Sequence, residues 1–102
     1  MPNFINFTPH AITLNDGRTF ASAGIARVGN TFTSFENDVC NVTYGDITGL
    51  PESVEGTLYI VSAMVLSAAK AAGRTDCVAP ATGHPECIRK DGFIVSVPGF
   101  VR

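Results

Sequence analysis

Two sets of polar residues in this chain have the chemistry to hold a small ligand. The first is the segment Asn6 to His10, which places an amide, a hydroxyl and an imidazole close together. Thr8 precedes Pro9, so its backbone is held extended. One interpretation is a rigid polar rim that hydrogen-bonds a ligand or a partner. The other is a capped strand end, in which Thr8 and His10 bond the backbone.

The second set consists of arginines. The guanidinium group of each can bind a phosphate through two parallel hydrogen bonds. The set comprises Arg27, Arg74, Arg89 and Arg102. Arg27 alternates with apolar residues in a strand-like run, whereas Arg74 and Asp76 follow a predicted helix and could form a local surface ion pair. Solvent exposure is the alternative for each arginine, and spacing alone does not predict that they converge.

The remaining candidates for chemistry are weaker. Cys77, His84 and Cys87 have the spacing C-x6-H-x2-C, which lacks the paired elements typical of zinc sites. Neither glycine-rich phosphate-binding motif occurs, and the acidic residues lie in turn-like contexts. We therefore expect no catalytic residues, no metal and no cofactor, and predict that the protein is not an enzyme.

Turn signals divide the first half into short β-rich runs, which predict strands over residues 4–7, 11–14, 19–20, 25–28, 31–35 and 39–44. Asn15-Asp16-Gly17 is typical of a tight turn, so residues 11–14 and 19–20 should pair antiparallel.

The segment Thr57 to Pro80 changes from strand to helix composition. Residues 58–61 are continuously apolar, which favours a central strand buried on both faces. Ser62 is placed to cap a helix over residues 63–72, and Gly73 suits the left-handed position after it. Asp91-Gly92 predicts a hairpin turn before a strand at residues 93–97. We expect one domain, residues 1–102, of the α+β class: a small, mostly antiparallel β-sheet with one main helix packed on it.

Composition limits the classes of function. Only 16% of the 102 residues are charged, against the usual ~25%. Either much of the surface is neutral and polar, or apolar surface is buried against another copy; we expect a homo-oligomer. The net charge of −2 disfavours polymeric nucleic acid as a partner. No signal peptide or membrane-length apolar run is visible, and the three cysteines do not suggest a disulfide framework, so we expect a cytoplasmic protein.

The chain resembles a group of short phage and prophage proteins that begin N-[LF]-T-P-H-A-I. The matching segments are residues 6–12, 23–28, 49–51, 59–62, 74–76 and 88–94. This group is in turn similar to the first Thoeris anti-defence family, whose oligomeric members sequester the cyclic ADP-ribose-type signal of bacterial TIR proteins, some also holding cyclic oligonucleotides. The resemblance implies that Arg27 and Arg89 bind phosphates while an aromatic ring stacks on adenine. The chain departs from that family in ending with strands rather than helices.

These observations lead to one expected function and two alternatives. We expect a non-enzymatic phage accessory protein that binds and sequesters a nucleotide-derived immune signal in the cytoplasm of an infected bacterium. The candidate ligand-binding residues are Asn6, Thr8, His10, Arg27, Tyr59, Ser62, Arg74, Asp76 and Arg89. The alternatives are a module that binds and inhibits a host protein, and a small component of the virion or its assembly.

Overall fold

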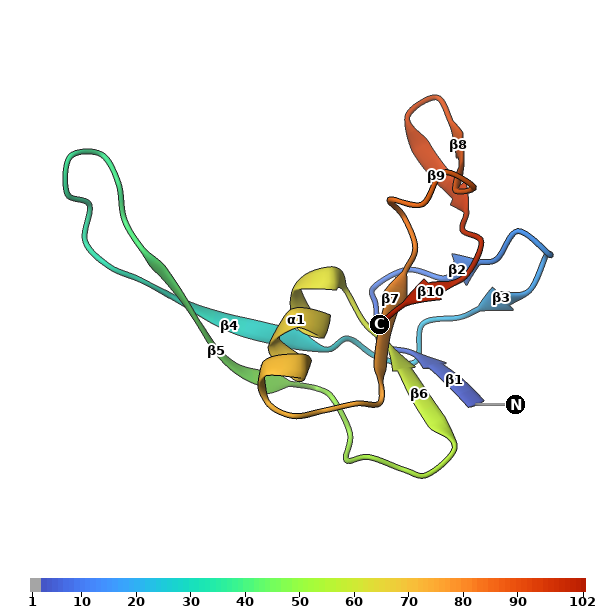
Figure 1. The fold of residues 1–102 in the computed structure, drawn as a ribbon, viewed down its shortest axis with the longest axis horizontal. Coiled ribbons are helices and arrows are strands. Elements are labelled where there is room, and N and C mark those ends of the chain that lie inside the picture. Colours follow the sequence, from blue (N-terminus) through green and yellow to red (C-terminus); the bar gives the residue numbers. More distant parts are fainter. Residues whose placement is uncertain (1–2) are drawn as a thin grey trace.

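The computed structural model describes residues 3–102 and contains several small sheets and one helix, so the fold is broadly α+β, as predicted (Figure 1). The largest sheet has four strands in the order β1-β6-β7-β10. Their bounds are β1 Asn3–Asn6, β6 Thr57–Ile60, β7 Cys77–Pro80 and β10 Phe100–Val101. Three two-stranded sheets surround it: β2 (Ile12–Thr13) with β3 (Thr19–Phe20), β4 (Arg27–Phe32) with β5 (Val42–Thr48), and β8 (Ile88–Lys90) with β9 (Phe93–Ser96).

The expectation of a single, mostly antiparallel sheet was wrong for the central sheet. Strand β6 pairs in parallel with β1 on one side, where Phe4 is opposite Leu58, and with β7 on the other, where Ile60 is opposite Val78. Only β10 runs antiparallel to its neighbour, β7. The cause is the helix between β6 and β7, which returns the chain to the same edge so that both strands run in one direction. The three two-stranded sheets are antiparallel, and turn signals predicted this for β2–β3 and β8–β9 but not for β4–β5.

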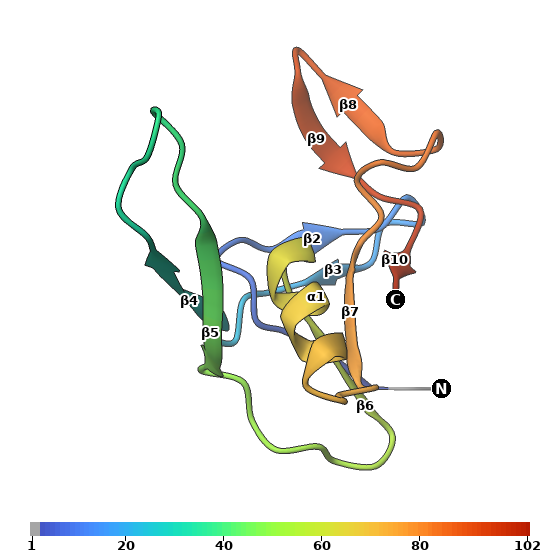
Figure 2. The same ribbon diagram turned by 60° about the vertical axis from the view of Figure 1, so that its left-hand side comes forward.

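Helix α1 (Ala63–Ala71) begins at the predicted residue and ends one residue before the predicted end, Ala72, which is its C-cap. The Ser62 side chain accepts a hydrogen bond from the Val65 N–H at 3.3 Å, which caps the first turn. Gly73 follows the helix with φ +86°, a conformation that favours glycine. The helix lies between β5 and β7 (Figure 2) and buries Val65, Leu66 and Ala69.

The central sheet is covered on both faces, which explains its continuously apolar middle strand. On the helix side, Tyr59 and Val61 join the residues buried by α1 in one hydrophobic core. On the other side, the rings of Phe4, Phe20 and Phe100 contact one another with centroids 5.0–5.8 Å apart. Side chains that alternate along a strand therefore enter two different apolar layers.

Two hairpins extend away from this core in both views (Figures 1 and 2). We call residues 27–48, which comprise β4, β5 and their connection, the arm. The predicted strands at 31–35 and 39–44 extended too far toward its tip, because Asn37 and Asp38 adopt positive φ angles of 52° and 65° and turn the chain there. The second hairpin, β8–β9, turns at Asp91 and Gly92, as predicted, also with positive φ.

The chain exposes more surface than a compact domain of its mass. Its radius of gyration is 15.4 Å, whereas about 13 Å is typical of this length. Its accessible surface is 6865 Å², compared with roughly 5,500 Å² for a monomer of 10.7 kDa.

The part of the chain that the structure describes, residues 3–102, contains no helix with the length and apolar character needed to span a membrane.

Candidate functional site

A cleft of about 290 Å³ at the start of α1 brings together three of the predicted ligand-binding residues, Thr8, Arg27 and Ser62. They come from the loop after β1, the first residue of β4 and the cap of α1. The other lining residues are Phe7, Pro9, Ile25, Ala26, Val28, Met64 and Val65. Segments distant in the sequence thus place hydroxyls and a guanidinium at the rim of a mostly apolar cleft.

Asn6 holds the loop that forms one wall of this cleft. Its side chain is only 1% exposed and donates to the carbonyl oxygens of His10, at 2.8 Å, and Phe20, at 2.9 Å. Its Oδ1 accepts from the Thr8 N–H at 2.8 Å and from the Thr8 hydroxyl at 2.6 Å. These bonds use the donors and the acceptor of the amide, so Asn6 positions Thr8 rather than facing the cleft. The capped-strand interpretation therefore describes Asn6 best.

Among the described residues that line the cleft, Arg27 is the only one with a charged side chain. Its position is fixed by the preceding residue, Ala26, whose N–H donates to the carbonyl of Phe7 at 2.9 Å. The Arg27 side chain is exposed, and within residues 3–102 no carboxylate lies within ion-pair distance of its guanidinium. An anion entering the cleft would therefore meet a guanidinium that is not already neutralised.

The start of α1 adds hydrogen-bond donors at the same place. The first N–H groups of a helix have no partner within the helix, and they carry a partial positive charge. The Ser62 hydroxyl satisfies the Val65 N–H, which leaves the N–H groups of Ala63 and Met64 for other acceptors. Together with Arg27, the helix start makes this end of the cleft favourable for a phosphate or carboxylate.

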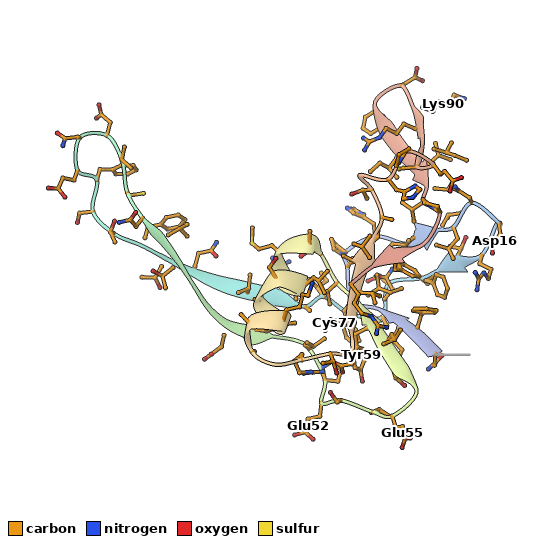
Figure 3. The ribbon with its side chains drawn as sticks, in the orientation of Figure 1. Asp16, Glu52, Glu55, Tyr59, Cys77 and Lys90 are labelled. Atoms are coloured by element: carbon orange, nitrogen blue, oxygen red, sulfur yellow. The ribbon has the colours of Figure 1, made fainter. Side chains whose placement is uncertain are left out.

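Tyr59 does not line the cleft. Its ring is buried and meets Phe7 edge-on at a centroid distance of 5.6 Å, and its hydroxyl donates to the Glu52 carbonyl at 3.2 Å. Figure 3 shows Tyr59 and Cys77 together at the centre of the molecule, away from the projecting hairpins. Tyr59 supports the wall of the cleft from behind, through Phe7, and its ring is not free to stack on a base.

Arg74 and Asp76 form a separate, partly buried ion pair beyond the other end of α1. The Arg74 guanidinium contacts the two carboxylate oxygens of Asp76 at 2.9 and 2.7 Å and also donates to the Pro51 carbonyl at 2.9 Å. Ser53 donates to the same carboxylate at 2.9 Å. The hydrogen bonds that Arg74 donates lower the pKa of Asp76, and the carboxylate that accepts them raises the pKa of Arg74. This pair fastens the loop before β6 to the residues after the helix. The local ion pair proposed from the sequence is therefore present, but it is partly buried rather than on the surface.

The last two predicted residues also lie outside the cleft. Arg89 is in β8 and donates to the carbonyl of Thr82 at 2.7 Å. The His10 side chain is exposed, and the contribution of this residue to the Asn6 network comes from its backbone oxygen. Among the described residues, Arg27 lines the cleft at the start of α1 and Arg89 does not.

The cysteines and histidines do not form a metal site in the described part of the chain, where no group of three or more metal-ligating side chains occurs. Cys77 is buried in β7, and burial raises the pKa of its thiol. His84 accepts a hydrogen bond from the Glu86 N–H at 3.0 Å.

Sequence reasoning missed Ile25 and Met64, which form part of the apolar wall of the cleft. Both follow ordinary strand or helix patterns, so nothing local distinguishes them from core residues. Comparisons of the chain with protein-family models, with curated proteins and with solved structures found no match.

Proposed function

We propose that this protein is a non-enzymatic binding protein that sequesters a small nucleotide-derived signal, of the cyclic ADP-ribose or cyclic oligonucleotide type. The ligand's phosphate is held at the start of α1 by Arg27, the Ser62 hydroxyl and the first N–H groups of the helix. The observation that carries this proposal is the un-neutralised guanidinium of Arg27 at a helix N-terminus, in a cleft with apolar walls. The nucleotide class rests on the resemblance described above, and the phosphate on the chemistry of the cleft.

The chemistry of these groups favours binding over catalysis. A guanidinium stays protonated in proteins, so Arg27 can donate hydrogen bonds but cannot accept a proton. The Ser62 hydroxyl accepts a bond from the helix and keeps its own hydrogen for the anion, whereas the Thr8 hydroxyl donates its hydrogen to Asn6. The groups that meet the anion are therefore hydrogen-bond donors, which hold it in place and leave its bonds intact.

The size of the cleft indicates how much of the ligand it holds. Pockets that enclose drug-sized ligands measure roughly 300–1,000 Å³, and this cleft is at the lower limit. It suits one phosphate and part of a ribose. We propose that a second copy of the chain covers the rest of the nucleotide.

Native mass spectrometry with a panel of cyclic ADP-ribose isomers and cyclic di- and trinucleotides tests the proposal. We expect the wild-type protein to gain one ligand mass per cleft and to release that ligand unchanged on denaturation. Arg27→Ala should weaken binding at least about tenfold, since a charge-assisted contact to phosphate is lost.

Arg18→Ala is the matched control, because Arg18 is also exposed but pairs with Asp16 in the β2–β3 turn. It removes the same charge and should bind the ligand like the wild type. Failure of the wild-type protein to bind any nucleotide of the panel, or equal binding by Arg27→Ala, would contradict the proposal.

Docking on a host protein is a second candidate function, favoured by the β8–β9 hairpin. This hairpin exposes the apolar side chains of Ile88, Phe93, Ile94 and Val95, and the Phe93 ring is 76% exposed. Exposed apolar groups on a projecting hairpin are typical of protein-binding surfaces. A host-lysate pull-down that yields no partner sensitive to Phe93→Ser would remove this candidate.

A further inference from the structure

We propose that the arm is an assembly element, and that its apolar tip binds a hollow on the exposed face of α1 in a second copy of this chain. The proposal concerns a different surface from the Arg27 cleft and does not depend on nucleotide binding. It specifies which parts of two copies meet.

The outer part of the arm leaves its apolar side chains exposed. The arm is a two-stranded ribbon whose residues 30–43 extend beyond the part that contacts α1 (Figure 1). Phe32 and Phe35 are 63% and 75% exposed, and Val39 and Val42 are exposed as well. An isolated two-stranded hairpin is marginally stable in water, so a ribbon with this apolar content gains stability when another surface covers it.

The same chain has an apolar hollow of about 690 Å³ that such side chains fit. It is lined by Gly45, Ala63, Met64, Ser67, Ala68, Ala71 and Ala72. Small side chains along one helix face leave room for large rings, and Met64, which is 50% exposed, is a flexible side chain that adapts to a partner.

Charge favours the same pairing. The tip of the arm carries Glu36 and Asp38, and its residues 30–43 contain no basic side chain. The segment 62–73, which includes α1, has Lys70 as its single charge. Lys70 lies outside the lining of the hollow, so a tip that places its phenylalanines there brings its two carboxylates to described lining residues that carry no charge, and meets no like charge on the helix.

The amount of exposed surface agrees with an interface of ordinary size. The chain exposes roughly 1,300 Å² more than a compact monomer of its mass, whereas a stable interface buries about 800 Å² per partner. A two-fold dimer in which each arm covers the other copy's helix is the smallest assembly that leaves neither arm uncovered.

Met64 lines both the hollow and the Arg27 cleft, so the bound arm would border the ligand site.

Sedimentation equilibrium of the full chain tests this interface. We expect the wild-type protein to be a dimer or a larger closed assembly, and Phe32→Ser/Phe35→Ser to raise the dissociation constant at least about 100-fold. Both rings are exposed in the single chain, so the double variant should keep its circular dichroism spectrum. Phe93→Ser is the matched control: it removes an equally exposed ring from the other hairpin and should leave the assembly intact.

A cross-linking experiment locates the contact. Cys40 lies near the arm tip and is partly exposed, while Ser67 lines the hollow. In a Cys87→Ser background, mild oxidation of the Ser67→Cys variant should join its new cysteine to Cys40 of a second copy, so that two copies carrying different tags become linked. A cysteine at Thr82, outside the hollow, should not form this link.

A monomeric wild type at tens of micromolar, an assembly unaffected by Phe32→Ser/Phe35→Ser, or equal cross-linking from Thr82→Cys would each overturn the proposal. If Arg27→Ala loses nucleotide binding but still assembles, the assembly proposal is unaffected. The experiments therefore test the two proposals independently.

Discussion

The Oδ1 atom of Asn6 accepts hydrogen bonds from both the backbone N–H and the hydroxyl of Thr8, at 2.8 and 2.6 Å. Asn6 is the last residue of β1, and Thr8 is at the rim of the Arg27 cleft. The relationship fixes the direction in which the chain leaves the sheet. It also links the central sheet to the β2–β3 hairpin, because the same amide donates to the carbonyl of Phe20.

Asn6→Ala is expected to destabilise the fold by about 3 kcal/mol or more, since it removes four hydrogen bonds and leaves partly buried polar groups of Thr8 and Phe20 without partners. Urea denaturation monitored by circular dichroism measures the change. Asn3→Ala is the control, because Asn3 is in the same strand but exposed, and it should cost about 0.5 kcal/mol or less. Equal losses from the two variants would show that the Asn6 network contributes little.

Gly49 is expected to tolerate no side chain. It has φ +81°, and a Cβ atom there would lie 2.3 Å from the carbonyl oxygen of Ile25. Gly49→Ala should therefore lower the free energy of unfolding by about 3 kcal/mol or more, through the strained φ and the clash together. Gly56→Ala separates the two causes, because Gly56 has φ +78° with no atom within 4 Å of the Cβ position.

Only the cost of the positive φ, about 1–2 kcal/mol, is expected at Gly56. The difference between the urea midpoints of the two variants measures how much stability is lost through the clash with Ile25, that is, how strongly the fold requires Gly49 to lie close to the segment that carries Arg27. If both variants unfold at the same midpoint, that approach is not required for the fold.

The Arg74–Asp76 pair predicts a loss of stability in acid. The hydrogen bond from Arg74 lowers the pKa of Asp76 below its ordinary value of 3.8 in the folded chain. The pair therefore contributes its full stability above the pKa of the unfolded state and loses it as the pH falls from about 5 through the lowered pKa.

Asp76→Asn should lower the free energy of unfolding by about 1–3 kcal/mol at pH 7 and flatten its decrease between pH 5 and pH 3. Urea titrations at several pH values provide the comparison. Asp16→Asn is the control: Asp16 also has a lowered pKa and an arginine partner, but the pair is exposed, so its effect should be smaller. The same pH dependence in Asp76→Asn and the wild type would contradict the assignment.

Local features of the fold could be predicted because a few neighbouring residues encode them. Ser62 and Gly73 mark the ends of α1 through capping and left-handed geometry, and Asp91-Gly92 supplies the positive φ angles of its hairpin. The continuously apolar run at 58–61 indicated a central strand, since a strand between two covered faces needs apolar side chains on both. In each case the physical cause lies within a few residues of its effect.

Only the tertiary structure decided which strands pair and which side chains meet. Nothing near Asn3–Asn6 indicates that its neighbour is the strand beginning at Thr57, because a parallel partner is chosen by packing over a long stretch of chain and not by a turn. The same distance effect placed Arg27 in the cleft at the start of α1, whereas Arg74 pairs with Asp76 beside a different hollow, which it lines with Arg102, and Arg89 bonds to the carbonyl of Thr82. The sequence by itself determined which residue types were available and where the helix and turns lie; the packing of distant strands decided which of those side chains meet.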